Sequence, residues 1–153
     1  MVMVGAMIQM LPVLAGTPVL WPRLFAAIVH PALVLGTLLF AGGLLFEEPK
    51  ILKLAIAMLG IGLAVFVVVM LVVLSRTGNW TDTAIAMALA LVALGATMVL
   101  GLTLAVSRAW GFALPNLSLA DLHPAWGLMG WTGLLLAGVA YHIVTMFQMT
   151  ANY

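Results

Sequence analysis

The sequence predicts an all-α fold: a polytopic transmembrane helical bundle with four full spans after a short or truncated first helix. Of its 153 residues, 66% are hydrophobic and 6% are charged, whereas soluble domains carry about 25% charged residues. The mean hydropathy is +1.31. Four apolar runs each exceed the roughly 20 residues that span a bilayer as a helix. The whole chain is therefore expected to form one transmembrane domain in contact with the lipid bilayer.

The first element is expected over residues 1–16. At about 1.5 Å per residue it covers roughly 24 Å, which is less than the roughly 30 Å of a hydrocarbon core. We interpret it as the second half of a helix whose first half precedes this sequence. The alternative is a short, tilted helix that thins the bilayer locally.

The other four elements are expected to be spanning helices at about 22–46, 51–74, 84–106 and 122–149. Helices are the default in hydrocarbon because a backbone there must satisfy its own hydrogen bonds. Polar breaks separate the runs at Gly16–Arg23, Glu47–Lys50, Ser75–Thr83 and Ser107–Asp121. No polar segment is long enough to form a soluble domain.

Composition also excludes several classes of site. The net charge of +1 gives no support for nucleic-acid binding. The chain has no cysteine, which excludes disulfides, thiolate metal sites, iron–sulfur clusters and covalent c-type haem attachment. No carboxylate lies within an apolar run, so nucleophilic and hydrolytic chemistry has no support.

Polar side chains within the apolar runs are the candidate functional residues. We call the membrane side at which the first helix ends the B side, and the opposite one the A side. Alternating spans place Gln9 about 10 Å and His30 about 13 Å from the B side. His142, six residues before Gln148, lies close to that side too, whereas His123 begins the last span near the A side.

Ionisable residues inside a membrane are costly, so each one is a functional hypothesis by default. Two histidines on two helices can ligate one haem iron from opposite faces, and small residues near His142 leave room for a porphyrin. We therefore predict haem b as cofactor, with His30 and His142 as iron ligands. In the alternative, each histidine bonds a neighbouring helix and the glycines serve close packing. His123 is expected to be either a wetted residue at a helix start, with Asp121 as the N-cap, or part of a site.

Two nearly identical tetrapeptides lie near the two ends of the sequence: "MIQM" at Met7–Met10 and "MFQM" at Met146–Met149. Parallel first and last spans predict equivalent depths for the two blocks. Gln9 and Gln148 then bond across the bundle or to the edge of a cofactor. The eleven methionines are expected mainly to pack, with haem or copper(I) ligation by these blocks as the alternative.

Two longer blocks carry a resemblance: "GAMIQMLPVLAG" (Gly5–Gly16) and "DLHPAWGLMGWTGLLLAGVAYHIVTMFQMT" (Asp121–Thr150). They resemble bacterial membrane proteins related to the haem–copper oxidase catalytic subunit and the NnrS family. The matching positions are Gln9, His123, Trp126, Gly127, Gly130, Trp131, Tyr141 and Gln148.

The resemblance implies an all-helical respiratory-type fold, haem binding, a longer chain and a place in the bacterial inner membrane. The chain departs from the family pattern at His142 and Thr145, where the family has Gln and Pro. It also lacks the paired histidines of a complete haem–copper centre, so oxygen reduction by this chain alone is not expected.

These observations favour a haem-b-binding, respiratory-type membrane subunit for electron transfer or nitric-oxide-related chemistry. One alternative is a non-catalytic helical assembly subunit of a larger membrane complex. Another is a small-molecule or proton conduit lined by Gln9, His30 and His142. Other membrane helices, or further copies of this chain, are the expected protein partners.

Overall fold

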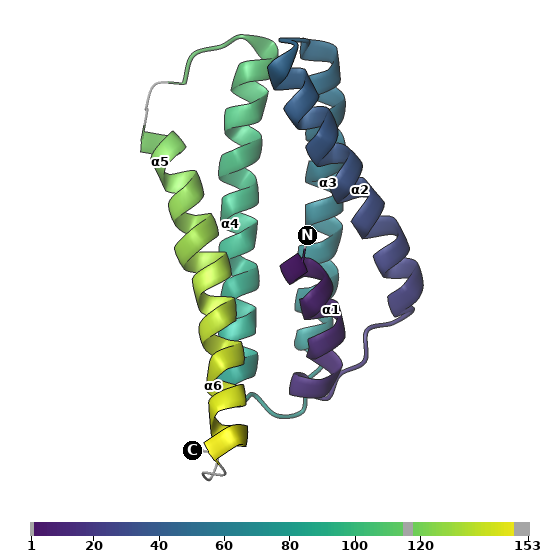
Figure 1. Ribbon diagram of the computed structural model, residues 1–153, viewed down its shortest axis with the longest axis vertical. Helices are drawn as coiled ribbons and strands as arrows, with labels where there is room; N and C mark the ends of the chain where they lie inside the picture. The colour runs from purple at the N-terminus through teal and green to yellow at the C-terminus, as the bar shows by residue number, and fades with distance from the viewer. Residues whose placement is uncertain (1, 115–117, 149–153) are drawn as a thin grey trace.

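A computed structural model describes residues 2–114 and 118–148, which form helices and no strand. The elements in order are α1 (Val2–Ala15), α2 (Pro22–Leu45), α3 (Pro49–Leu74), α4 (Asp82–Trp110), α5 (Ser118–Ala125), the π-helix η1 (Trp126–Gly133) and α6 (Leu134–Gln148). The last three form one continuous helical rod (Figure 1).

The predicted all-α architecture is confirmed. Among the described residues, four helical stretches are long and apolar enough to cross a membrane: α2, α3, α4 and the rod Ser118–Gln148. The described part of α1 covers 14 residues, too few to span. The part of the chain that the structure describes thus has the architecture of an integral membrane protein, with four helices of spanning length and a short first helix.

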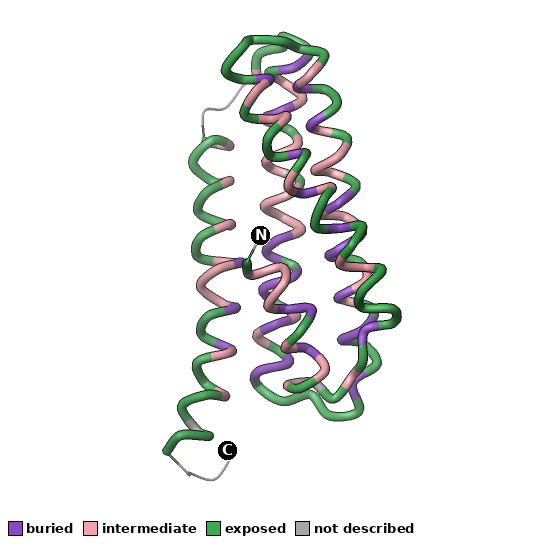
Figure 2. Tube along the Cα trace, turned by 45° about the vertical axis from the view of Figure 1, so that its right-hand side comes forward, coloured by how far each residue is buried: buried purple, intermediate pink, exposed green. Residues whose placement is uncertain are grey.

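The helices alternate in direction along the bundle. Figure 1 shows α1 beside the lower half of the bundle only, running from about mid-height to the lower end, which is the B side. The α5–η1–α6 rod runs in the same direction as α1. The rod and α2 lie on opposite flanks, and α3 and α4 lie between them (Figures 1 and 2).

Local sequence signals set the helix ends. Pro22 and Pro49 stand at the first turns of α2 and α3, where a missing N–H costs no helix bond. The Thr81 hydroxyl accepts a hydrogen bond from the Ala84 backbone N–H (3.2 Å) and so caps α4. Gly111, with φ +73°, ends α4 in the left-handed conformation that glycine adopts without strain.

The hydrophobic core lies mainly in the B-side half, where α1 packs against the other helices. An aromatic ladder crosses it. The Phe25 ring stacks on Phe66, with centroids 6.4 Å apart, and Phe66 meets Trp131 edge-on at 6.3 Å. The ladder joins α2, α3 and η1, and Phe66 is fully buried. Buried positions follow the inward sides of the helices (Figure 2).

Glycines bring neighbouring helices close together. A Cβ added at Gly43 of α2 would lie 2.9 Å from the backbone nitrogen of Leu52 in α3. On the rod, added Cβ atoms at Gly130 and Gly138 would each lie 2.7 Å from an alanine Cβ of α4. Small residues at such positions allow close van der Waals packing, which drives helix association in lipid.

The last span differs from its prediction in two ways. It begins at Ser118, so Asp121 lies within the first turn of α5 and is not the N-cap. Its middle, Trp126–Gly133, is a π-helix, in which the Thr132 hydroxyl donates to the Gly127 carbonyl five residues earlier (3.1 Å). Short π segments often occur at functional sites. Hydropathy alone does not distinguish a π segment from an α-helix.

Candidate functional site

Gln9 and His30 lie on the same groove between α1 and α2. The groove has a volume of about 370 Å³, and its other lining residues are small or aliphatic apart from Pro31. The groove is open at Gly5, Ala26 and Ala27 because these residues have little or no side chain to fill it. The sequence prediction placed Gln9 and His30 at similar depth on neighbouring spans, and the structure brings these two together.

Neither of these polar side chains is satisfied within the described part of the chain. Gln9 and His30 are both exposed, and neither makes a side-chain hydrogen bond or ion pair among residues 2–114 and 118–148. An amide or imidazole without a partner costs a few kcal/mol in hydrocarbon. The groove therefore presents hydrogen-bonding groups to whatever occupies it.

Two prolines lie one helical turn after residues that line this groove. Pro12 lies inside α1 and Pro31 inside α2. Because proline has no N–H, the carbonyls four residues earlier, those of Ile8 and Ala27, lose their usual helix donor. Ile8 and Ala27 both line the groove. The positions of the two prolines are visible in the sequence. Only the structure shows that the residue four positions before each of them lines the groove.

Arg23 extends the same face of α2 toward the B side. Arg23 and His30 are seven residues apart, which is nearly two helical turns, so both lie on one face about 10 Å apart along the axis. Ala26 and Ala27 lie between them on that face and line the groove. Arg23 is exposed. It was not among the predicted site residues, although its spacing to His30 is readable from the sequence.

His142 does not join this site. It is half-buried on α6, where it makes a contact of its own, and it does not line the groove. The helix α6 packs on α4 and η1, whereas α2 packs on α3 and α1. The two helices lie on opposite flanks (Figure 1). The arrangement in which His30 and His142 face each other across one iron is therefore not formed, because depth along the chain does not fix the lateral order of helices.

The two glutamine blocks do not lie at equal depth. Met3, Met7 and Met10 of α1 share a cavity with Leu135 and Val139 of α6. The exposed Gln148 is nine residues beyond Val139, or about 13 Å nearer the B side. Gln9 therefore does not bond Gln148 across the bundle, contrary to the prediction. Met149 lies outside the described residues.

His123 is part of the contact between α5 and α4. Its Nδ1 lies 3.0 Å from the Thr97 backbone carbonyl oxygen, to which a protonated Nδ1 donates. The ring packs on Gly101, where an added Cβ would lie 2.6 Å from the ring carbon Cε1. His123 is half-buried. His123 is therefore an interhelical contact of the last span, six residues into the described part of that helix.

A metal centre of several histidine and carboxylate ligands is not present in the described part of the chain. No group of three or more His, Asp or Glu side chains lies close enough there to hold one ion. The candidate site thus consists of one imidazole, one amide and a cation along the α1–α2 groove.

The chain matches no family model, no curated protein and no solved structure. The resemblance to proteins related to the haem–copper oxidase catalytic subunit and the NnrS family therefore remains a prediction from the residues.

Proposed function

We propose that this protein is a haem-b-binding, respiratory-type subunit of a bacterial inner membrane, and that the α1–α2 groove holds the haem. The observation that carries the proposal is that His30 and Gln9, neither with a partner among the described residues, line one groove between two apolar helices. Neutral imidazole is a common axial ligand of haem iron.

The residues of the groove fit a haem. His30 offers a ring nitrogen to iron, and the small side chains of Gly5, Ala26 and Ala27 leave space for a flat macrocycle. Arg23 lies on the same face toward the membrane boundary, where a guanidinium would bind the propionate carboxylates. Gln9 would donate a hydrogen bond at the macrocycle edge. Bound haem would supply one-electron transfer or binding of a diatomic gas.

The groove is open on its outer side, where Gln9 and His30 are exposed. A haem held there would be covered only in part by this chain. Another membrane helix, from a second subunit or from a second copy, would cover the rest. The proposal therefore includes a larger helical assembly in which His30 would be the iron ligand that this chain supplies.

The test is the visible spectrum of the purified protein and of two variants. His30→Ala should lose the Soret band and the reduced-minus-oxidised signal, because it removes the iron ligand. His142→Ala is the matched control and should keep both, since His142 lies on the opposite flank. A wild-type protein without haem, or a full spectrum in His30→Ala, would show the haem proposal to be wrong.

A second candidate, a proton conduit, has its own observation in favour. Ile8 and Ala27, whose carbonyls lose their usual helix donors to prolines, line the groove together with Gln9 and His30. Such groups bind water and pass protons when a covering helix closes the groove. In proteoliposomes with an internal pH dye, the wild type should dissipate an imposed pH gradient and His30→Leu should not. Equal rates for both, at the level of empty vesicles, would exclude the conduit.

A further inference from the structure

A second cavity lies on the other side of α1, between α1, α4 and α6. Its volume is about 230 Å³, and four methionines line it together with aliphatic side chains: Met3, Met7, Met10 and Met87. It is separate from the groove described above, since the two share no lining residue.

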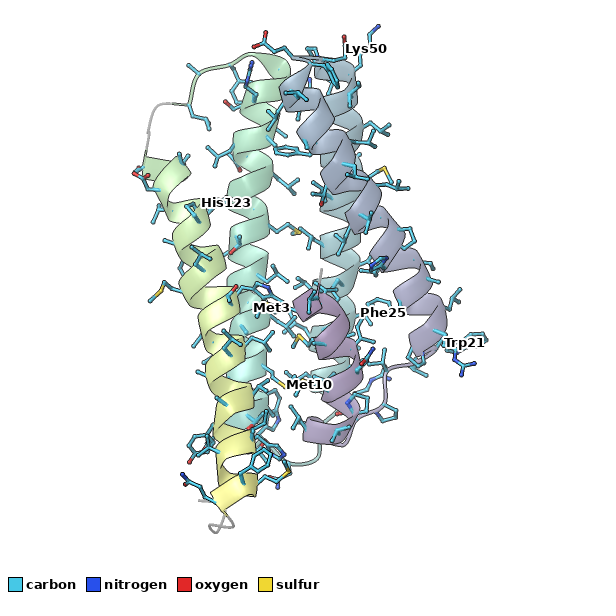
Figure 3. All side chains as sticks on the ribbon, viewed as in Figure 1. Met3, Met10, Trp21, Phe25, Lys50 and His123 are labelled. Carbon is cyan, nitrogen blue, oxygen red and sulfur yellow. The ribbon has the colours of Figure 1, made fainter. Side chains whose placement is uncertain are left out.

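Three of the four methionines form a stripe on α1. Positions 3, 7 and 10 are spaced by four and three residues, so their side chains lie on one helix face. Figure 3 shows Met3 and Met10 on the side of α1 that faces α4 and α6. Met87 approaches from α4. Met7 and Met87 are 1% and 0% exposed, so both thioethers are inside the protein.

The chemistry of the cavity is that of a soft-metal site. No nitrogen or oxygen of a side chain lines it, so the four thioether sulfurs are its polarisable groups. Thioethers select copper(I) over the harder divalent ions, and they need no deprotonation to bind. Each methionine side chain has three rotatable bonds, which let sulfurs from two helices converge on one ion. Packing alone would require no sulfur, because leucine fills similar volume.

We propose that Met3, Met7, Met10 and Met87 form a copper(I) site within the membrane-embedded part of this protein. The ligands are neutral thioethers and the cavity lining is apolar, an environment that favours copper(I) over copper(II). Neither His30 nor haem takes part in this site. The proposal therefore stands or falls independently of the function assigned to the α1–α2 groove.

The test is anaerobic copper(I) titration of the purified full chain in detergent, in competition with a colorimetric copper(I) chelator. The wild type should retain one copper(I) per chain. Met7→Leu and Met87→Leu should each weaken retention by about tenfold or more, and the double variant should retain none. Met129→Leu is the matched control, because Met129 is 77% exposed on the rod and does not line the cavity. It should bind as the wild type does.

Two further measurements distinguish this site from others. Copper X-ray absorption of the loaded protein should show a first shell of sulfur only, and silver(I), which is redox-inert, should compete for the same site. The His30→Ala variant should retain copper fully. No copper on the wild type, full retention in the Met7→Leu/Met87→Leu double variant, or nitrogen ligands in the first shell would each overturn the proposal and leave packing as the role of these methionines.

Discussion

Substituting Gly101 by alanine tests whether His123 fastens α5 to α4. The added Cβ would lie 2.6 Å from His123 Cε1, which no real Cβ tolerates, so the ring must move. Its movement breaks the hydrogen bond between Nδ1 and the Thr97 carbonyl, 3.0 Å long in the native protein. The substitution therefore combines overpacking with the loss of an interhelical hydrogen bond.

The magnitudes of these effects set the expected result for Gly101→Ala. An interhelical hydrogen bond in a membrane protein contributes about 0.6 kcal/mol, and overpacking costs about 1–3 kcal/mol. Alanine recovers up to about 1 kcal/mol of helix propensity. Gly101→Ala should therefore lower the free energy of unfolding by about 1–3 kcal/mol. In the His123→Ala background the clash disappears, and the same change should be neutral or slightly stabilising.

The assay is a double-mutant cycle. Unfolding in mixed detergent micelles, followed by far-ultraviolet circular dichroism and tryptophan fluorescence, gives the free energy of unfolding of each variant. The two substitutions should show a coupling energy of about 2 kcal/mol. Gly95→Ala is the matched control on α4, because an added Cβ there meets nothing within 4 Å. If Gly101→Ala destabilises equally with and without His123, the ring does not occupy the place described here.

Two other close approaches give further predictions. Gly43→Ala brings a Cβ within 2.9 Å of the Leu52 backbone nitrogen and should cost about 1–3 kcal/mol in the same unfolding assay, whereas Gly42→Ala, which meets nothing, should cost nothing. Equal effects at both positions would contradict the α2–α3 packing. Gly138→Ala places a Cβ 2.7 Å from Ala86 Cβ and should destabilise similarly, and Ala86→Gly in the same chain should restore most of the loss. Failure of that rescue would place the rod elsewhere on α4.

The number of spanning helices among the described residues and their approximate limits were predictable from the sequence, because a spanning helix needs only length and an apolar surface. The spans expected at about 22–46 and 51–74 are found at Pro22–Leu45 and Pro49–Leu74. The span expected at 84–106 continues to Trp110, where Gly111 stops it. Depth was predictable in the same way for Gln9 and His30, since a residue rises about 1.5 Å, but not for Gln148, because α6 extends further toward the B side than α1 does. This is why Gln9 and His30 were expected at one level.

Only the tertiary structure decided which helices are neighbours and how each helix is rotated about its own axis. A helix that is apolar on every side carries no stripe to show which face meets its neighbours, so the sequence could not place His142 on the flank opposite His30. For the same reason it could not pair Met87 with the α1 methionines, or His123 with the Thr97 carbonyl. The chain itself determines how many times it crosses the membrane. Close packing of small residues and the few interhelical hydrogen bonds determine which side chains meet there.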